Sequence, residues 1–281
     1  MKFFNIFILS IFSLSNATKL EYTTTLQLIR LPLLIYDYNK KYNYTSVKDI
    51  KGDIQILNEL SNYAPNGQVK LFLDNPKSGL QAGITKSDKF KRICVVFRGS
   101  EEKLDWYHNL LAWKYKLPNY KCKVHKGFYK QLNDYDNFIK ISDQLKLEIS
   151  KNPSYSVYIL GHSLGGALAS IFGFLYANTT NNFITVISFA SPRVGDKKFK
   201  ELFENQTNLR HYRFTNKNDI VPNIPIINYH HTGIHINIKN NKFKIGKKNT
   251  VFNSFSIKDH DINDYYENLK KGKGWDSLNL N

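Results

Sequence analysis

Residues 156–170 read SVYILGHSLGGALAS, and this stretch decides the fold. The apolar run SVYIL predicts a buried strand, and the small residues that follow Ser163 predict a helix packed closely against its neighbours. Gly161 and Gly165 frame Ser163 in the pattern G-x-S-x-G. A tight strand-to-helix turn needs small residues because its backbone passes close to adjacent segments. The stretch therefore predicts a sharp elbow that holds the Ser163 hydroxyl clear of a sheet, at a helix N-terminus.

The sequence around this elbow predicts a single α/β domain over residues 18–281. Runs rich in β-branched residues predict strands at 68–73, 80–85, 92–98, 155–160, 183–189, 210–215, 233–238 and 242–246. Helical patterns are found at 24–40, 47–62, 126–150, 164–177 and about 261–270. This alternation favours a mainly parallel central sheet flanked by helices. Asn240-Asn241, between the last two strands, is typical of a two-residue hairpin.

The composition excludes a largely disordered chain and leaves the meaning of its charge open. The 281 residues are 42% hydrophobic and 14% aromatic, which is enough to bury a core. The 40 basic and 23 acidic residues give a formal net charge of +17, which favours an anionic partner such as a membrane surface. The chain is also rich in residues with A/T-rich codons, so nucleotide bias is an alternative source of the charge. No nucleic-acid-binding motif accompanies it, and we expect no nucleic-acid partner.

Residues 1–17 read MKFFNIFILSIFSLSNA and differ from the rest of the chain. A basic start, a short apolar run and small residues before a cleavage point are typical of a secretory signal peptide, here ending at Ala17. The run is short for a transmembrane helix and is interrupted by serine, although an uncleaved anchor is an alternative. We therefore expect a secreted protein whose folded domain begins at residue 18.

If the protein is secreted, it can carry N-linked glycans and form a disulfide. The sequons at Asn43, Asn178 and Asn205 become candidate N-glycosylation sites, although some will be accidental in an asparagine-rich chain. Cys94 and Cys122 are the only cysteines, so one bridge between them is the only intramolecular disulfide that the chain allows. Cys94 lies in an apolar strand, however, so a buried free thiol at this position is an equally good interpretation.

A serine at such an elbow needs a base and an orienting acid to become a nucleophile. In this kind of fold the acid follows the serine in the chain and the histidine follows the acid. The acids after Ser163 include Asp196, Asp219 and Asp259, and the histidines after Asp219 are His230, His231, His235 and His260. Asp219 follows the strand 210–215, at the edge where α/β sheets present their functional loops. We expect Asp196 to be structural and Asp259 to be a carboxylate at a helix N-terminus.

The segment GHSLGGALA (161–169) resembles the nucleophile segment of the fungal-type triacylglycerol lipases, the class 3 lipase family. Other segments agree in the same order: VVFRGS (95–100), DWYHNL (105–110), VHKGF (124–128), SFASPRVGD (188–196), FTNKNDIVPNIP (214–225) and DHDINDYY (259–266). The resemblance covers about residues 80–266, whereas residues 18–79 match only in general helical character. It implies an α/β-hydrolase fold and hydrolysis of acyl esters without a metal or cofactor.

The resemblance also implies roles for five residues. Ser163 matches the nucleophile, Asp219 the acid and His260 the base, the last in the pattern D-H-x-x-x-x-Y. Ser100 matches the position whose backbone amide lines the oxyanion hole, and the amide of Leu164 at the helix N-terminus supplies the second donor. His231 is kept as a reserve base. It does not pair with His235 on a metal, because four residues of extended chain span about 13 Å, too far for a single zinc ion.

Residues 101–117 match the lid of that family, a short amphipathic helix over the serine. Its proposed apolar side chains include Leu104, Trp106, Tyr107 and Leu111. The alternative is that Trp106 and its neighbours are ordinary core residues.

The function predicted from the sequence is that of a secreted serine esterase, a triacylglycerol lipase that binds a lipid–water interface transiently and hydrolyses acylglycerol esters. Phospholipase A1 or feruloyl esterase activity on the same fold is the first alternative, since the sequence does not reveal the shape of the substrate pocket. A non-catalytic lipid-binding homologue is the second alternative, and the intact Ser-Asp-His set argues against it.

Overall fold

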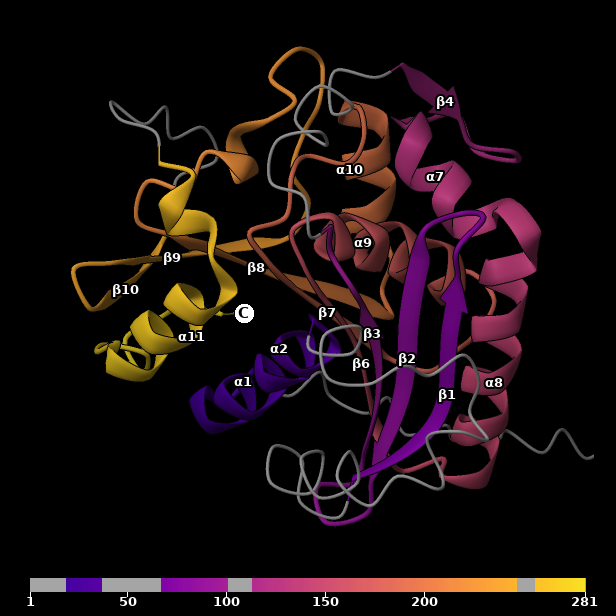
Figure 1. The fold of residues 1–281 in the computed structure, drawn as a ribbon, viewed down its shortest axis with the longest axis horizontal. Helices are drawn as coiled ribbons and strands as arrows, with labels where there is room; N and C mark the ends of the chain where they lie inside the picture. The colour runs from indigo at the N-terminus through magenta and orange to yellow at the C-terminus, as the bar shows by residue number, and fades with distance from the viewer. Residues whose placement is uncertain (1–18, 37–66, 101–112, 247–255, 281) are drawn as a thin grey trace, which may run out of the picture.

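The computed structural model describes residues 19–36, 67–100, 113–246 and 256–280, and it contains an eight-stranded sheet in the order β1-β2-β3-β6-β7-β8-β9-β10. Strands β3, β6, β7, β8 and β9 run parallel, and β1, β2 and β10 join antiparallel at the two edges. The prediction of a mainly parallel sheet flanked by helices is therefore confirmed (Figure 1). The signal-peptide segment 1–17 and the predicted helix 47–62 lie outside the described residues.

The strands are β1 (Gly67–Asn75), β2 (Leu80–Ser87), β3 (Arg92–Phe97), β4 (Lys114–Lys116), β5 (Lys123–His125), β6 (Ser156–His162), β7 (Ile184–Phe189), β8 (Leu209–Asn216), β9 (Ile234–Lys239) and β10 (Lys242–Ile245). The α-helices are α1 (Tyr22–Leu28), α2 (Arg30–Tyr36), α7 (Lys126–Asn133), α8 (Asn137–Lys151), α9 (Leu164–Ala177), α10 (Lys197–Glu204) and α11 (Ile262–Lys271). Three short 3₁₀ turns are η1 (Asp134–Asp136), η2 (Val221–Asn223) and η3 (Lys258–His260).

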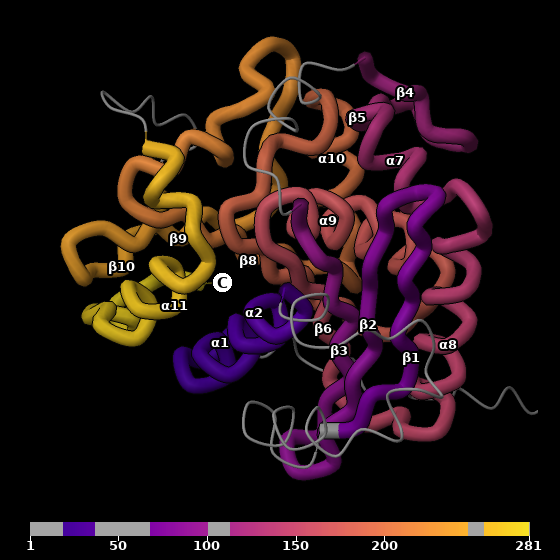
Figure 2. Tube along the Cα trace, viewed as in Figure 1, coloured from indigo at the N-terminus to yellow at the C-terminus, as the bar shows by residue number. Residues whose placement is uncertain are grey.

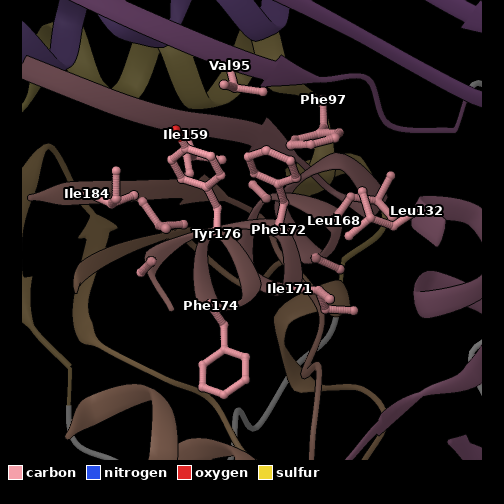
Figure 3. Packing of buried hydrophobic residues seen from close by; sticks show 14 of the residues in the cluster. Val95, Phe97, Leu132, Ile159, Leu168, Ile171, Phe172, Phe174, Tyr176 and Ile184 are labelled. Carbon is pink, nitrogen blue, oxygen red and sulfur yellow. The ribbon is translucent and has the colours of Figure 1, made fainter. Parts of the chain in front are cut away.

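The helices cover the sheet in two layers, each over its own core cluster. Helices α7, α8 and α9 pack on one face, and the aromatic rings of Phe97, Phe172 and Tyr176 meet there (Figure 3). Helices α1, α2 and α11 cover the other face, although they come from opposite ends of the chain (Figure 2). The Tyr22 hydroxyl donates to the backbone oxygen of Leu269 at 3.0 Å, so the N-terminal helices are tied to the C-terminal one.

Two features of the predicted secondary structure need comment. The predicted hairpin is confirmed, since Lys239 pairs with Lys242 and both intervening asparagines have positive φ, as a two-residue turn requires. The helix predicted at 126–150 is wrong as a single element, because it breaks into α7 and α8 at η1. Tyr135 and Asp136 there have φ of 58° and 61°, left-handed values that an α-helix cannot contain.

The disulfide that the sequence left open does not form. Cys94 and Cys122 are both buried free thiols. Cys94 belongs to the core cluster under α1 and α2, whereas Cys122 belongs to the cluster on the α9 face, so the sheet separates the two sulfurs. Burial raises the pKa of the Cys94 thiol to about 11 and that of Cys122 to about 12, which keeps both protonated at neutral pH.

In the described part of the chain, no helix is both long and apolar enough to cross a bilayer. Two of the three sequon asparagines, Asn178 and Asn205, are exposed at the C-terminal ends of α9 and α10, although the Asn178 side-chain amide donates to the Phe174 oxygen at 2.7 Å. Asn43 lies outside the described residues. Glycosylation of all three stays a prediction.

A buried histidine cross-links the sheet to the loop before β9. His211 on β8 has one ring nitrogen 2.8 Å from the Ser188 hydroxyl on β7 and the other 2.8 Å from the Thr232 hydroxyl. Burial, helped by the nearby Arg213 cation, lowers the pKa of His211 to about 3. The folded protein therefore keeps this ring neutral in a pH range where the unfolded chain binds a proton.

His211 should make the stability of the fold depend on pH. Its pKa in the unfolded chain is about 6.5, so its contribution is complete above that pH and is lost as the pH falls toward 3, by about 1.4 kcal/mol per pH unit. From pH 7 to pH 5 the protein should lose about 2 kcal/mol of unfolding free energy through this group. Urea unfolding at both pH values measures the loss, and the His211→Gln variant should lose about that much less than the wild type.

The His230→Gln variant is the matched control. His230 is partly exposed, so its removal should leave most of the pH dependence in place. If the wild type and His211→Gln lose the same free energy between pH 7 and pH 5, the buried neutral histidine is not a source of the pH dependence.

Candidate active site

The predicted elbow is present between β6 and α9. Strand β6 ends at His162, α9 begins at Leu164, and Ser163 between them has φ 57° and ψ −126°, a conformation that L-residues rarely adopt. Close packing explains the two glycines that frame it. A Cβ atom on Gly161 would lie 2.1 Å from the backbone of Gly165, and one on Gly165 would lie 2.2 Å from the Phe97 oxygen.

Three residues from three separate loops meet at this elbow. Ser163 Oγ lies 2.8 Å from His260 Nε2, and His260 Nδ1 lies 3.0 Å from the nearer carboxylate oxygen of Asp219. A neutral imidazole with its proton on Nδ1 satisfies both contacts, because it donates to the carboxylate and accepts from the serine hydroxyl. The side chains are almost completely buried, with exposed fractions of 3% for Ser163, 1% for Asp219 and 7% for His260.

Asp219 receives hydrogen bonds from three sides. The Val221 amide donates to one carboxylate oxygen at 2.9 Å, and the Tyr265 hydroxyl donates to the other at 2.7 Å. Burial and the Asp219 charge raise the pKa of Tyr265 well above 10, so its hydroxyl keeps its proton. Together with His260, these donors hold the buried carboxylate in one orientation. Sequence reasoning assigned no role to Tyr265, although it is the last residue of the D-H-x-x-x-x-Y pattern.

The two proposed oxyanion donors lie at the same edge of the sheet. Strands β3 and β6 are parallel neighbours with Phe97 opposite Gly161, so the segments after them leave the sheet side by side. Ser100 lies three residues beyond Phe97, and Leu164 lies three residues beyond Gly161. Leu164 is the first residue of α9, where the helix leaves its backbone amides without an internal acceptor. This geometry suits a negative charge that develops above Ser163.

The other acids lie elsewhere. Asp196 caps α10 by accepting from the Phe199 amide at 2.8 Å, in line with the structural role expected for it. The expectation for Asp259 is wrong, because Asp261 caps α11. Asp259 lies within the 3₁₀ turn η3, before the start of α11, and accepts from the Asn218 amide at 3.3 Å.

The remaining candidates do not join the site. The reserve base His231 directs its Nε2 to the Pro222 oxygen, and His235 lies against the Thr215 hydroxyl at 2.7 Å. Within the described ranges, no group of three or more histidine, cysteine, aspartate or glutamate side chains is arranged to hold a metal ion. The proposed lid residues Leu104, Trp106, Tyr107 and Leu111 lie outside the described residues.

Known proteins resemble this chain in sequence. The chain is 31% identical to a lipase of Rhizopus niveus over 179 residues, which span 59% of this chain and 43% of that protein. It is 33% identical to a lipase of Rhizomucor miehei over 151 residues, which span 51% and 40%. A phospholipase A1-IIgamma of Arabidopsis thaliana is 32% identical over 168 residues, which span 50% and 40%. The matches thus span about two fifths of the length of these relatives.

Solved structures of low sequence identity share the fold. The triacylglyceride lipase of Rhizomucor miehei superposes with a TM-score of 0.66 at 22% identity, over 79% of this chain and 82% of that one. Lipase II from Rhizopus niveus gives a TM-score of 0.64 at 23% identity, over 85% and 93%. The family model described as "Lipase (class 3)" matches residues 94–229, which include the elbow and Asp219. Residues 94–229 thus resemble the class 3 lipases, and the chain has the α/β-hydrolase fold.

Proposed function

We propose that this chain is a serine ester hydrolase, a triacylglycerol lipase, with Ser163 as nucleophile, His260 as general base and Asp219 as the acid that orients it. One observation carries the proposal: His260 lies within hydrogen-bond distance of both the Ser163 hydroxyl and the Asp219 carboxylate, at 2.8 and 3.0 Å. Its lipase relatives support the same activity.

The reaction runs in two halves. Ser163 Oγ attacks the ester carbonyl carbon while its proton passes to His260 Nε2, and Asp219 stabilises the imidazolium that forms. The carbonyl oxygen becomes an oxyanion that accepts hydrogen bonds from the backbone amides of Ser100 and Leu164. Collapse of this intermediate breaks the ester C–O bond, and His260 returns the proton to the departing alcohol. Water then attacks the acyl-serine in the same way, releasing the fatty acid and restoring the Ser163 hydroxyl.

Removal of the nucleophile or the base should abolish hydrolysis. Ser163→Ala and His260→Ala should each lower kcat by about 10³-fold or more, because neither the attacking oxygen nor its proton acceptor can be replaced by a neighbour. Asp219→Asn should lower it somewhat less. Hydrolysis of a soluble 4-nitrophenyl ester measures the rates, and circular dichroism checks folding.

His231→Ala is the matched control, since His231 contacts the Pro222 oxygen and not Ser163. This variant should keep most of the activity. An inactive His231→Ala beside an active His260→Ala would show that the base has been assigned wrongly.

We also propose that the enzyme works at a lipid surface. Three large apolar side chains are highly exposed: Trp113 (85%), Ile226 (72%) and Ile227 (78%). The loop that carries the two isoleucines follows Asp219 and η2, and Arg193 holds it by donating to the Pro225 oxygen at 2.9 Å. Trp113 lies within the proposed lid segment 101–117, in which residues 114–116 form strand β4 and not the expected helix. The Nζ atom of the neighbouring Lys114 lies 4.4 Å from the ring centre of Tyr229, just beyond the same loop. Such exposed apolar groups beside the site support binding to lipid.

Replacing Ile226 and Ile227 together by serine should weaken activity on an emulsion. Each side chain that leaves water for lipid contributes about 1.5 kcal/mol, so the pair should raise the emulsion concentration for half-maximal rate at least tenfold. The rate on a dissolved short-chain ester should not change. Both rates are measured by titration of released acid.

A double variant on α8, Ile139→Ser with Leu147→Ser, is the matched control. Both side chains are exposed, and α8 packs against β1 and β2, away from the loop that carries Ile226 and Ile227 (Figure 1). It should leave the emulsion titration unchanged. An equal loss in the two double variants would show that the loop with Ile226 and Ile227 is not the lipid contact.

Phospholipase A1 activity is the alternative that a specific finding favours, because the relatives include phospholipases A1 of Arabidopsis thaliana and Oryza sativa at 32% and 33% identity. Release of fatty acid from triolein and from phosphatidylglycerol, measured side by side, distinguishes the two. Faster release from triolein supports the lipase, and faster release from phosphatidylglycerol supports the alternative. Fatty-acid release that Ser163→Ala abolishes excludes non-catalytic binding, and a methyl ferulate that is hydrolysed more slowly than triolein argues against the feruloyl esterase.

We further propose that the enzyme is secreted and acts outside the cell. The order of basic, apolar and small residues in segment 1–17 supports this. Expression of the full chain in a eukaryotic host tests it. Secreted protein that begins at residue 18 is expected, whereas retention of segment 1–17 in a cell-associated product would favour an anchor.

A further inference from the structure

His162, the residue before the nucleophile, lies in a hydrogen-bonded chain that the reaction scheme does not use. Its Nδ1 is 3.0 Å from the Tyr36 hydroxyl at the end of α2, and its Nε2 is 2.9 Å from the backbone oxygen of His260. The side chain is buried, and the rings of His162 and His260 have centroids 4.8 Å apart. One imidazole thus connects the N-terminal helices to the backbone of the proposed base.

The partners of His162 fix its protonation. A carbonyl oxygen only accepts hydrogen bonds, so Nε2 carries the proton and donates to His260. Nδ1 is then an acceptor, and the Tyr36 hydroxyl donates to it. Burial, reinforced by the electrostatic effect of the neighbouring His260, lowers the pKa of His162 well below 6.5 and keeps the ring neutral. Without the Tyr36 hydroxyl, the tautomer that donates to His260 would leave Nδ1 buried without its donor.

We propose that His162 and Tyr36 are a positioning pair, in which Tyr36 sets the tautomer of His162 and His162 holds the backbone of His260 so that its imidazole faces Ser163. This inference rests on the proposed function, because it gives the pair a role only if His260 is the base.

The local structure around His260 explains why such a hold is needed. His260 ends the three-residue turn η3, where its own amide donates to the Ile257 oxygen at 3.1 Å. A turn this short has few backbone hydrogen bonds to fix the direction of its last peptide. Because His162 adjoins Ser163 in the chain, its bond to the His260 oxygen fixes the backbone of the base relative to that of the nucleophile. An error of about 1 Å in that relation is enough to lower the rate about 10²-fold.

The Tyr36 hydroxyl occupies space that a glycine leaves open in the segment between β3 and the proposed oxyanion donor Ser100. A Cβ atom on Gly99 would lie 1.9 Å from the Tyr36 hydroxyl oxygen and 2.7 Å from the His162 backbone oxygen. Glycine at position 99 therefore leaves the space in which the hydroxyl reaches His162. Helix α2, in a part of the chain where the family resemblance is weakest, thus reaches the centre of the site.

A double-mutant cycle tests the pair on the full chain, with 4-nitrophenyl butyrate as the soluble substrate. The variants are Tyr36→Phe, His162→Phe and the two combined, with His162→Gln as the conservative variant whose amide can still donate to the His260 oxygen. Tyr212→Phe is the matched control, because it removes another buried hydroxyl, which donates to the Leu280 oxygen. Thermal unfolding of every variant checks the fold.

The pair predicts a specific pattern of rates. His162→Phe should lower kcat about 30-fold and leave KM within about twofold, since it misaligns the base without touching the bound ester. Tyr36→Phe should lower kcat about fivefold, and it should have almost no effect when added to His162→Phe, because both act through one hydrogen bond. His162→Gln should recover most of the lost kcat, and Tyr212→Phe should match the wild type.

Other patterns overturn the proposal. Effects of Tyr36→Phe and His162→Phe that multiply independently, or a His162→Gln as slow as His162→Phe, would show that the residues act only through packing. If His162→Phe does not fold, the comparison of Tyr36→Phe with Tyr212→Phe decides, and equal kcat values overturn the pair. A wild type that hydrolyses no ester overturns the proposed function itself, whereas an active wild type with an additive cycle overturns only the positioning pair.

Discussion

The backbone at Ser163 is the constraint on which the rest of the site depends. Its φ of 57° and ψ of −126° are strained for an L-residue, at a cost of about 1–3 kcal/mol, and the strain persists because the surrounding packing leaves no alternative. Gly161 and Gly165 let β6, α9 and the end of β3 approach within distances that any side chain would prevent. Helix α9 is buried over nearly its whole length, so its N-terminus cannot shift to relieve the turn.

Parallel strands bring the other groups to this elbow. Ser163, Asp219 and the proposed oxyanion donors follow the C-terminal ends of the parallel strands β3, β6 and β8, which lie at one edge of the sheet. His260 reaches the same edge from the far end of the chain and is held there by side chains, through Asp219 on its ring and His162 on its backbone oxygen. The site therefore combines a rigid half, built on β6 and α9, with a base held by hydrogen bonds from residues distant in sequence.

The sequence predicts the parts of the structure that local pattern determines. The elbow, helix 164–177 and the Asn240-Asn241 hairpin could be predicted because glycine spacing, apolar periodicity and turn chemistry are local signals. The helical pattern over 126–150 does not predict the break between α7 and α8, although the Asn- and Asp-rich segment 133–137 is a local signal for a turn there. The contact of Tyr36 with His162 joins residues 126 positions apart, and no local pattern encodes it. Cys94 and Cys122 lie on opposite sides of the sheet, and this too depends on the tertiary structure and not on a local pattern.

The central claim is that the elbow and His260 make Ser163 uniquely reactive among the serines of the chain. Labelling the full protein with a fluorophosphonate, followed by peptide mass spectrometry, tests this directly because the reagent bonds covalently to activated serine oxygens. The account predicts a single adduct on the peptide that contains Ser163 and loss of that adduct in the His260→Ala variant. An adduct on a different serine, or labelling of Ser163 that is equally fast without His260, would contradict it.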